Sequence, residues 1–314
     1  MHLRRYLATS ATLAVLIGGL LIGPVVAATP AEVAADKGGI ELQRGNFAAA
    51  ASLLTEALGG ELANERKANV LNDRGVAQWR LGKLKAALTD FNDAVQIYPE
   101  FAAIYNNRAT VLLSLNEPEE ALKDLDRALL LAPSYVAAIN NRAIANLALG
   151  KHSEAIADFN HAAQLQPTSP TAFNGRGRVQ LALNRPYAAI RDFTQAIALD
   201  PQFRLAYRNR AGVFADLARA QQGLDDLTSA LSFAGDDPAL LLARGEALIR
   251  LKDYGGAIRD LSRVVELDPR SAAALADRGM AYAHVKEFEK AMADFTAALD
   301  IDKRTITAYV NRAF

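Results

Sequence analysis

The stretch that decides the fold is AAIYNNRATVLLSLNEPEEALKDLDRALLLAPSY, residues 102–135, followed directly by VAAINNRAIANLALGKHSEAIADFNHAAQLQPTS, residues 136–169. Both stretches are 34 residues long, and both carry Asn-Asn-Arg-Ala near the start and an aspartate sixteen residues after the arginine. A period of this length is longer than one helix or strand. It therefore predicts a repeated supersecondary unit.

The period continues along the chain in both directions. An arginine recurs at steps of 34, at Arg74, Arg108, Arg142, Arg176, Arg210, Arg244, Arg278 and Arg312, and a glycine or alanine follows each one. An aspartate recurs at the same step, at Asp90, Asp124, Asp158, Asp192, Asp226, Asp260 and Asp294, each before Phe or Leu. A period held this strictly predicts an array of equivalent units.

Each unit has the pattern of two helices, when its positions are counted from Ala102 as position 1. Positions 4, 8 and 11 share one face of a first helix, and positions 20, 24 and 27 share one face of a second. Gly or Asn at position 15, as in Gly82 and Asn116, suits the left-handed residue that ends a helix. Pro118 and Pro186 then suit the start of the second helix. Because one hairpin cannot bury its apolar face alone, the units are expected to stack into an all-α solenoid.

The pattern resembles the tetratricopeptide repeat, with small residues at positions 8, 20 and 27 and proline at 32. The resemblance covers residues 31–314: a degenerate first repeat at 31–67, seven repeats at 68–305 and a half repeat at 306–314. It implies an α-solenoid, a right-handed superhelix of antiparallel helix hairpins, that binds partners along its concave surface. The first helix of each unit would make most of that surface.

The first 27 residues differ from the rest. Arg4 and Arg5 precede an apolar run, no acid occurs before Glu32, and small residues precede a possible cleavage site after Ala27. This pattern is typical of a secretory signal peptide, residues 1–27, and predicts a periplasmic or secreted protein. The alternative is an uncleaved segment that anchors the protein in the inner membrane, facing the periplasm; the chain would meet a membrane only in that case.

Composition argues against several function classes. Lys+Arg and Asp+Glu both number 35, so the basic excess expected of a nucleic-acid binder is missing. Cysteine is absent and there are four histidines, which leaves little material for a metal site. We find no catalytic motif, and no length remains for a catalytic domain outside the repeats. The sequence predicts no enzyme activity, no cofactor and no nucleic-acid partner.

The arginine and aspartate series allow two interpretations. They could form a charged ligand surface, or they could be structural ion pairs between adjacent helices. We favour the structural interpretation, because the arginine lies beside the packed positions 4, 8 and 11. The pairs could form within a unit, as Arg108 with Asp124, or between units, as Asp90 with Arg108.

A second polar series is a candidate peptide-binding site. Positions 5 and 6 carry asparagine in several units, and a carboxamide both donates and accepts hydrogen bonds, as a peptide backbone requires. The series resembles the asparagine ladders with which such arrays hold extended peptides. The candidate residues are Asn72, Asn106, Asn107, Asn140, Asn141, Asn174 and Asn209. The alternative is that these amides bond to neighbouring helices or to water.

An apolar stripe at position 12 accompanies the asparagines, formed by Trp79, Leu113, Leu147, Leu181 and Ile249. Together these features predict a non-catalytic scaffold or adaptor of the cell envelope that binds an extended peptide or a partner protein. Two alternatives remain open at this point: a self-associating assembly factor that uses the half repeat, and a docking regulator of an envelope hydrolase.

Overall fold

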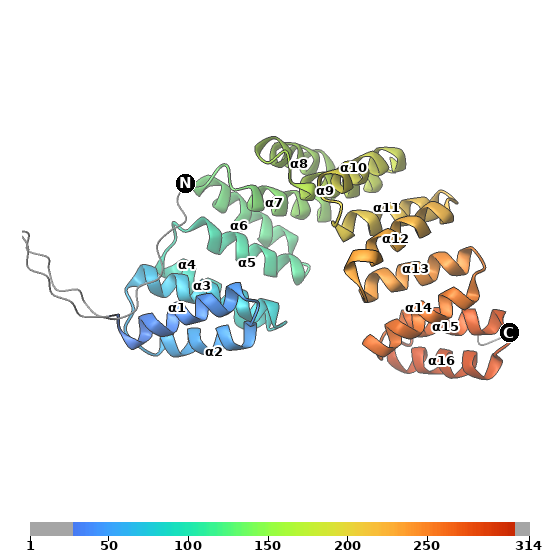
Figure 1. Ribbon diagram of the computed structural model, residues 1–314. Helices are drawn as coiled ribbons and strands as arrows, with labels where there is room; N and C mark the ends of the chain where they lie inside the picture. The colour runs from blue at the N-terminus through green and yellow to red at the C-terminus, as the bar shows by residue number, and fades with distance from the viewer. Residues whose placement is uncertain (1–27, 305–314) are drawn as a thin grey trace, which may run out of the picture.

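The computed structural model describes residues 28–304, and all of their regular secondary structure is helical (Figure 1). The helices are α1 (Pro30–Gln43), α2 (Phe47–Leu58), α3 (Asn64–Arg80), α4 (Leu84–Ile97), α5 (Ala102–Ser114), α6 (Pro118–Leu131), α7 (Val136–Ala148), α8 (His152–Leu165), α9 (Pro170–Ala182), α10 (Pro186–Leu199), α11 (Arg204–Asp216), α12 (Ala220–Ala234), α13 (Pro238–Arg250), α14 (Tyr254–Leu267), α15 (Ala272–His284) and α16 (Phe288–Ile301). Consecutive helices pair into hairpins, which we number repeats 1 to 8.

The turn inside each hairpin is made by one residue with positive φ at position 15. Gly45, Gly82, Asn116, Gly150 and Asn184, for which the sequence predicts this conformation, have φ between 54° and 80°. Three later repeats use Ala218, Lys252 and Lys286 in the same turn, with φ from 57° to 65°. Pro118 and Pro186 are the first residues of α6 and α10, as predicted. The turn geometry is therefore constant even where the residue type is unfavourable.

Small residues bring the two helices of each hairpin together. The alanines at position 20, such as Ala87 and Ala121, are fully buried. At position 8, a Cβ added to Gly75 would lie 2.8 Å from the ring of Phe91, and one added to Gly245 would lie 2.8 Å from Leu261. The large residue at position 24 therefore occupies the space that the small residue at position 8 leaves.

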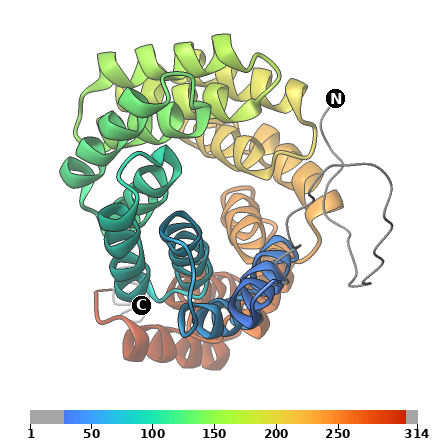
Figure 2. The same cartoon turned by 90° about the vertical axis from the view of Figure 1, so that its left-hand side faces the viewer.

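The solenoid curves because the two kinds of helix have different neighbours. Each odd-numbered helix contacts the odd-numbered helix of the next repeat, whereas within residues 28–304 no two even-numbered helices contact one another. The odd-numbered helices therefore line the inner, concave side and the even-numbered helices the outer side. Figure 2 shows the helices arranged around an open centre, with the first and last repeats displaced along the axis as in Figure 1.

The first repeat joins the array differently from the others. Helix α3 has 17 residues and begins at Asn64, whereas the corresponding helices α5 to α15 have 13. Repeat 1, residues 31–67, is three residues longer than the 34-residue repeats that follow, and the extra turn at the start of α3 takes up this added length between Gly59 and Asn64. The signal peptide expected at 1–27 lies outside the described residues, and so does the half repeat expected at 306–314.

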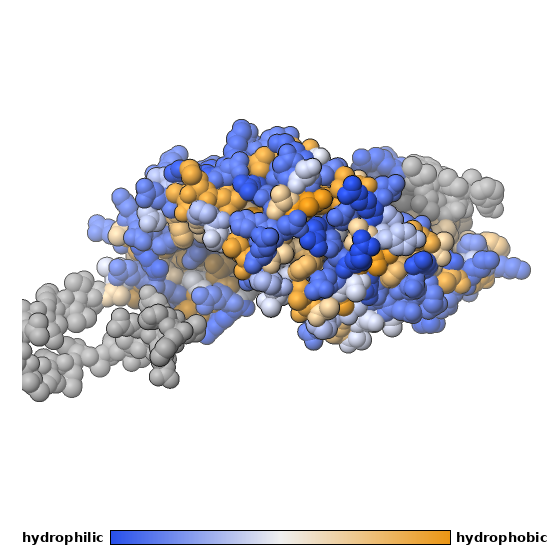
Figure 3. Space-filling view, turned by 90° about the horizontal axis from the view of Figure 1, so that it is seen from above, coloured by the Kyte–Doolittle hydropathy of each residue, from blue (hydrophilic) through white to orange (hydrophobic). Residues whose placement is uncertain are grey.

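None of the helices in residues 28–304 is long and apolar enough to cross a bilayer. On the face shown in Figure 3, hydrophobic residues are scattered among hydrophilic ones.

Candidate functional site

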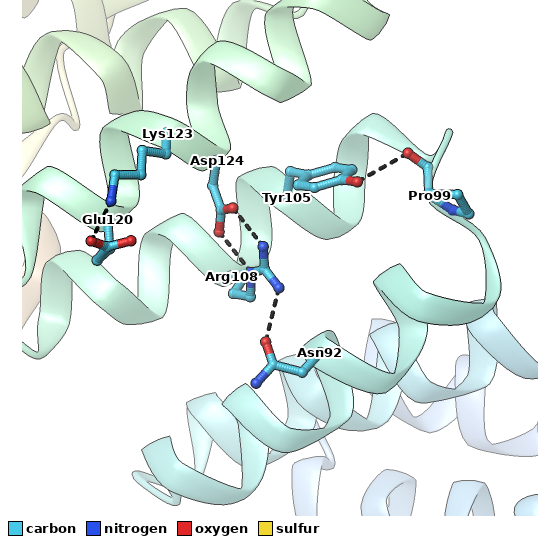
Figure 4. A network of polar contacts seen from close by, with 7 residues as sticks. All are labelled: Asn92, Pro99, Tyr105, Arg108, Glu120, Lys123 and Asp124. Atoms are coloured by element: carbon cyan, nitrogen blue, oxygen red, sulfur yellow. Dashed lines mark hydrogen bonds and ion pairs between the residues drawn. The ribbon is translucent and has the colours of Figure 1, made fainter.

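The recurring arginine and aspartate form a fork-like ion pair inside every described repeat from 2 to 8. Arg108 Nε donates to Asp124 Oδ2 at 2.7 Å, and Arg108 Nη2 donates to Asp124 Oδ1 at 2.6 Å (Figure 4). The other six pairs repeat this geometry: Arg74–Asp90, Arg142–Asp158, Arg176–Asp192, Arg210–Asp226, Arg244–Asp260 and Arg278–Asp294. The partner is therefore the aspartate of the same repeat, one of the two schemes that the sequence left open.

The third nitrogen of most of these arginines reaches the preceding repeat. Arg108 Nη1 donates to Asn92 Oδ1 on α4 at 2.8 Å, and Arg142 Nη1 donates to Asp126 Oδ1 on α6 at 3.0 Å. The corresponding acceptors for Arg74, Arg176, Arg210 and Arg278 are Thr55, Asn160, Thr194 and Ser262. One guanidinium thus joins three helices from two repeats.

Burial decides between the two interpretations of this series. The seven aspartates are each 8% exposed or less, so their carboxylates face helices rather than a ligand. The hydrogen bond to Asp124 raises the pKa of the Arg108 guanidinium above its ordinary value. The series is a structural framework, and the concave face must be described from other residues.

The asparagines at positions 5 and 6 form hydrogen bonds between successive inner helices. The Nδ2 amide at position 6 donates to the Oδ1 oxygen at position 5 of the preceding repeat, at 2.9 Å in each of three rungs. The rungs are Asn107 to Asn72, Asn141 to Asn106 and Asn209 to Asn174. These amides therefore bond to neighbouring helices, which is the alternative that the sequence left open.

The rung between repeats 4 and 5 is missing, because position 6 of repeat 5 is Gly175. The Oδ1 atom of Asn140 is buried without a hydrogen-bond partner, although its Nδ2 donates to the Val136 carbonyl at 3.0 Å. A Cβ on Gly175 would lie 2.2 Å from the ring of Phe159. Phe159 is also the one phenylalanine at position 24 that faces an alanine, Ala143, at position 8 of its own repeat.

This exception has a steric cause. The other three phenylalanines at position 24 each contact a glycine at position 8 of their own repeat, as Phe193 does with Gly177. Phe159 has Ala143 at position 8 of its own repeat in place of a glycine. Its ring lies instead against Gly175 in the next repeat. The absence of one rung is thus a consequence of packing.

The candidate peptide-binding residues consequently divide into two groups. Asn72, Asn106, Asn140 and Asn174 at position 5 are between 6% and 8% exposed, so they lie between helices. Asn107, Asn141 and Asn209 at position 6 are half-buried. The sequence placed both groups on the open concave face, whereas the structure places the first group beneath it. That any of them contacts a peptide stays a prediction.

The position 12 stripe is more accessible than the asparagines at position 5. Trp79, Leu113, Leu147 and Ile249 are half-buried, and Leu181 is 37% exposed. Trp79, Leu113, Leu147 and Ile249 pack against the apolar core with one part of the side chain and leave the other part uncovered by any described helix. The inner helices therefore present a discontinuous apolar surface flanked by amides.

At the last joint of the described array, position 6 of repeat 8 is an acid, Asp277, in place of an asparagine, and a second acid, Glu246 at position 9 of repeat 7, lies nearby. Burial, together with the nearby charge of Glu246 on α13, raises the pKa of Asp277 on α15 from 3.8 to about 6. Burial also raises the pKa of Glu246, which Arg250 partly counteracts. Position 5 of the preceding repeat is here Leu242, so the amide partner available in the rungs is replaced by a hydrocarbon side chain.

Within residues 28–304 there is no group of three or more histidines or acids placed to hold a metal ion. The ring of His284 stacks on Tyr254, with ring centroids 4.3 Å apart, so this histidine has a packing contact. The surface offers amides, apolar side chains and a few charges, which are groups that recognise polypeptide.

Comparison with known families agrees with the helical pairs seen here. A family model described as Tetratricopeptide repeat matches residues 36–100, 106–170 and 242–304, and a second model of the same description matches 170–203. The chain belongs to the tetratricopeptide repeat family. Proteins of this family are generally non-catalytic scaffolds for protein–protein interaction.

Solved tetratricopeptide repeat structures share the fold at low sequence identity. Yeast Tom70 is 18% identical with a TM-score of 0.70, over 94% of this chain and 64% of that one. A tetratricopeptide repeat protein from Parabacteroides merdae is 20% identical with a TM-score of 0.64, over 84% of this chain and 99% of that one.

The Cut9–Hcn1 hetero-tetramer of the APC/C contains a chain that is 20% identical to this one, with a TM-score of 0.64 over 85% of this chain. This chain spans 52% of the length of that one. A search of curated proteins gave no match. Identities at this level show the fold alone.

The amide rungs lead to a first prediction about tetratricopeptide repeats 4 and 5. Asn174→Ala removes the acceptor of the Asn209 amide, so we expect it to destabilise the array by about 1 kcal/mol. Asn140→Ala, at the equivalent position one repeat earlier, removes an oxygen that has no partner, and the only bond it loses is to the Val136 carbonyl within its own helix, so it should cost less. Urea unfolding midpoints measure both, and equal losses would contradict the assigned rungs.

A second prediction concerns the steric origin of the missing rung. Gly175→Asn alone should destabilise the array by about 1–3 kcal/mol, because its side chain and the Phe159 ring need the same space. Adding Phe159→Leu recreates the Ala–Leu pairing of repeats 3 and 6 and should recover part of that loss. A double-mutant cycle measures the coupling, which we expect to be at least about 1 kcal/mol. Additive effects would show that the two residues do not compete.

A third prediction follows from the raised pKa of Asp277. The folded state binds this proton more tightly than the unfolded state does, so stability should fall as pH rises from about 4 through about 6. Asp277→Asn should therefore stabilise the protein by about 1–3 kcal/mol near pH 8 and have little effect near pH 4. Urea midpoints at both pH values test this, with the exposed Asp300→Asn as control. A gain that is independent of pH would refute the assignment.

Proposed function

We propose that the array is a non-catalytic adaptor of the cell envelope that holds an extended segment of a partner protein along its concave face. The observation that carries the proposal is the position 12 stripe, because its apolar side chains lie on the inner helices and stay partly uncovered by the described chain. Apolar area left accessible in an otherwise well-packed array is typical of an interaction surface.

The neighbouring amides support an extended rather than a globular partner segment. Asn107, Asn141 and Asn209 are half-buried beside the stripe, and each uses its Nδ2 group in a rung. No rung uses their Oδ1 oxygens. Asn107 Oδ1 accepts one long bond, from Asn106 Nδ2 at 3.4 Å, and a carboxamide oxygen has two lone pairs, so these acceptors suit the backbone N–H groups of a strand-like peptide. The rungs also hold each amide in a defined orientation, which reduces the entropy lost on binding.

The envelope location is supported by the sequence pattern of residues 1–27 alone. The partner's identity is left to the experiment, since one repeat scaffold serves many unrelated partners.

Photo-crosslinking in cells tests the proposal directly. A photoreactive phenylalanine analogue at Leu113 or Leu147 should capture one and the same protein, identified by mass spectrometry. The same analogue at Glu154, which is exposed on the outer helix α8, is the matched control and should not capture it. Capture from Glu154 alone, or from none of the sites, would contradict binding on the concave face. Capture of a second copy of this chain would instead support self-assembly.

A further inference from the structure

A cavity of about 570 Å³ lies where the turn of repeat 6 meets repeat 7. It is lined by Ala215, Ala218, Arg219, Ala220, Gln221, Gln222, Arg250 and Leu251, from helices α11, α12 and α13 and their turns. Ala215 is position 12 of repeat 6, so the cavity continues the apolar stripe of the concave face.

The cavity exists because repeat 6 has small residues where other repeats have large ones. Position 12 is Trp, Leu or Ile in repeats 2 to 5 and 7, whereas repeats 6 and 8 carry Ala215 and Ala283. Position 17 is Leu, Pro, His, Tyr or Phe in repeats 2 to 5, 7 and 8 but Ala220 in repeat 6, so repeat 6 alone among these is small at both positions. In repeat 7 the residue at position 17, Tyr254, stacks on His284 at position 13 of the next repeat. The equivalent place between Ala220 and Arg250 is left as open volume.

The charge around this cavity is positive and only weakly balanced. Of the ion pairs within 4.0 Å in residues 28–304, none involves Arg219 or Arg250. The guanidinium of Arg219 lies 5.9 Å from the ring centroid of Tyr187, and that of Arg250 has Glu246 one helical turn away. Both arginines are exposed, so both can reach a bound group.

The backbone adds to this positive charge. Helix α12 begins at Ala220, its first turn lines the cavity, and no side chain caps its N-terminus. Free N–H groups and the helix dipole favour an anion at such an end. The amide of Gln221 is occupied, since its Nε2 donates to Asp225 Oδ1 at 3.0 Å, which leaves the two guanidiniums, the Gln222 amide and the helix end to bind an anion.

We propose that this cavity is a subsite that takes the side-chain carboxylate of an aspartate or glutamate in the partner segment. Two guanidiniums supply donors that match a carboxylate, and the alanines and Leu251 supply an apolar wall for the methylene groups that carry it. The role in partner recognition rests on the proposed function, whereas binding of a carboxylate by the cavity does not.

The test is a titration of the full chain that needs no partner. The probe is N-acetyl-L-glutamate N-methylamide, a glutamate side chain with both ends blocked, and the readout is the NMR signal of the arginine Nε–H groups. We expect saturable shifts for Arg219 and Arg250 with a millimolar dissociation constant. The signal of Arg80, which occupies the position of Arg250 in repeat 2, should shift at least fivefold less.

Two controls make the result specific. The glutamine analogue of the probe has the same shape without the charge and should give no saturable shift. Ala220→Tyr, which places in repeat 6 the residue that repeat 7 carries at this position, should occupy the space between position 17 and Arg250 and weaken binding while the other arginine signals stay in place.

Several outcomes would overturn the proposal: no saturable shift, an equal shift at Arg80, or an unchanged shift in Ala220→Tyr. A shift with N-acetylglycine but not with the blocked glutamate would assign the cavity to a chain-terminal carboxylate instead. A failed titration together with a partner captured from Leu113 and Leu147 would leave the adaptor function standing. A successful titration without a captured partner would overturn the adaptor function and keep the carboxylate site.

Discussion

In repeats 2 to 8, each arginine from Arg74 to Arg278 holds a buried aspartate in its own repeat with two nitrogens and, in most repeats, a side chain of the preceding repeat with the third. The rigid planar guanidinium fixes the directions of these bonds, so it sets the positions of three helices relative to one another. Because the carboxylate is buried, loss of one partner would leave an uncompensated charge and cost roughly 3–5 kcal/mol, although the intact pair adds little net stability. The frame therefore specifies geometry, while apolar burial supplies most of the favourable free energy.

Within each repeat, the size of the residue at position 24 is matched by the size of the residue it packs against. A large residue at position 24 needs a small one opposite it, which Gly177 provides for Phe193. At Phe159 the space comes from Gly175 in the next repeat, and the hydrogen bond to Asn140 is lost as a result. The size of one side chain in a repeat thus changes the hydrogen bonds between that repeat and the next, because stacked repeats share a single core.

The arginine–aspartate pairs and the packed positions are nearly constant, whereas a few positions on the inner helices vary between repeats. These variable positions determine the local polarity and charge of the concave face. Position 12 carries large apolar residues in most repeats and Ala215 in repeat 6, where a cavity beside two arginines takes their place. In the next two repeats, Glu246 of repeat 7 and Asp277 of repeat 8 introduce negative charge. A partner segment that follows this groove would meet apolar, positive and negative surroundings in turn, so the order of side chains along the segment would determine its fit.

The sequence by itself determined the repeat, its hairpin turns and the all-α solenoid, because a strict 34-residue period with small residues and helix-ending residues at fixed positions admits one kind of packing. It also predicted the arginine–aspartate pairs as structural. Only the tertiary structure decided that the pairs lie within repeats, that the asparagines at position 5 are buried, and that repeat 6 contains a cavity. Each of these features depends on which side chains from different helices pack against one another. Helical periodicity predicts the face on which a residue lies, but it does not predict which residue of a neighbouring helix covers that face.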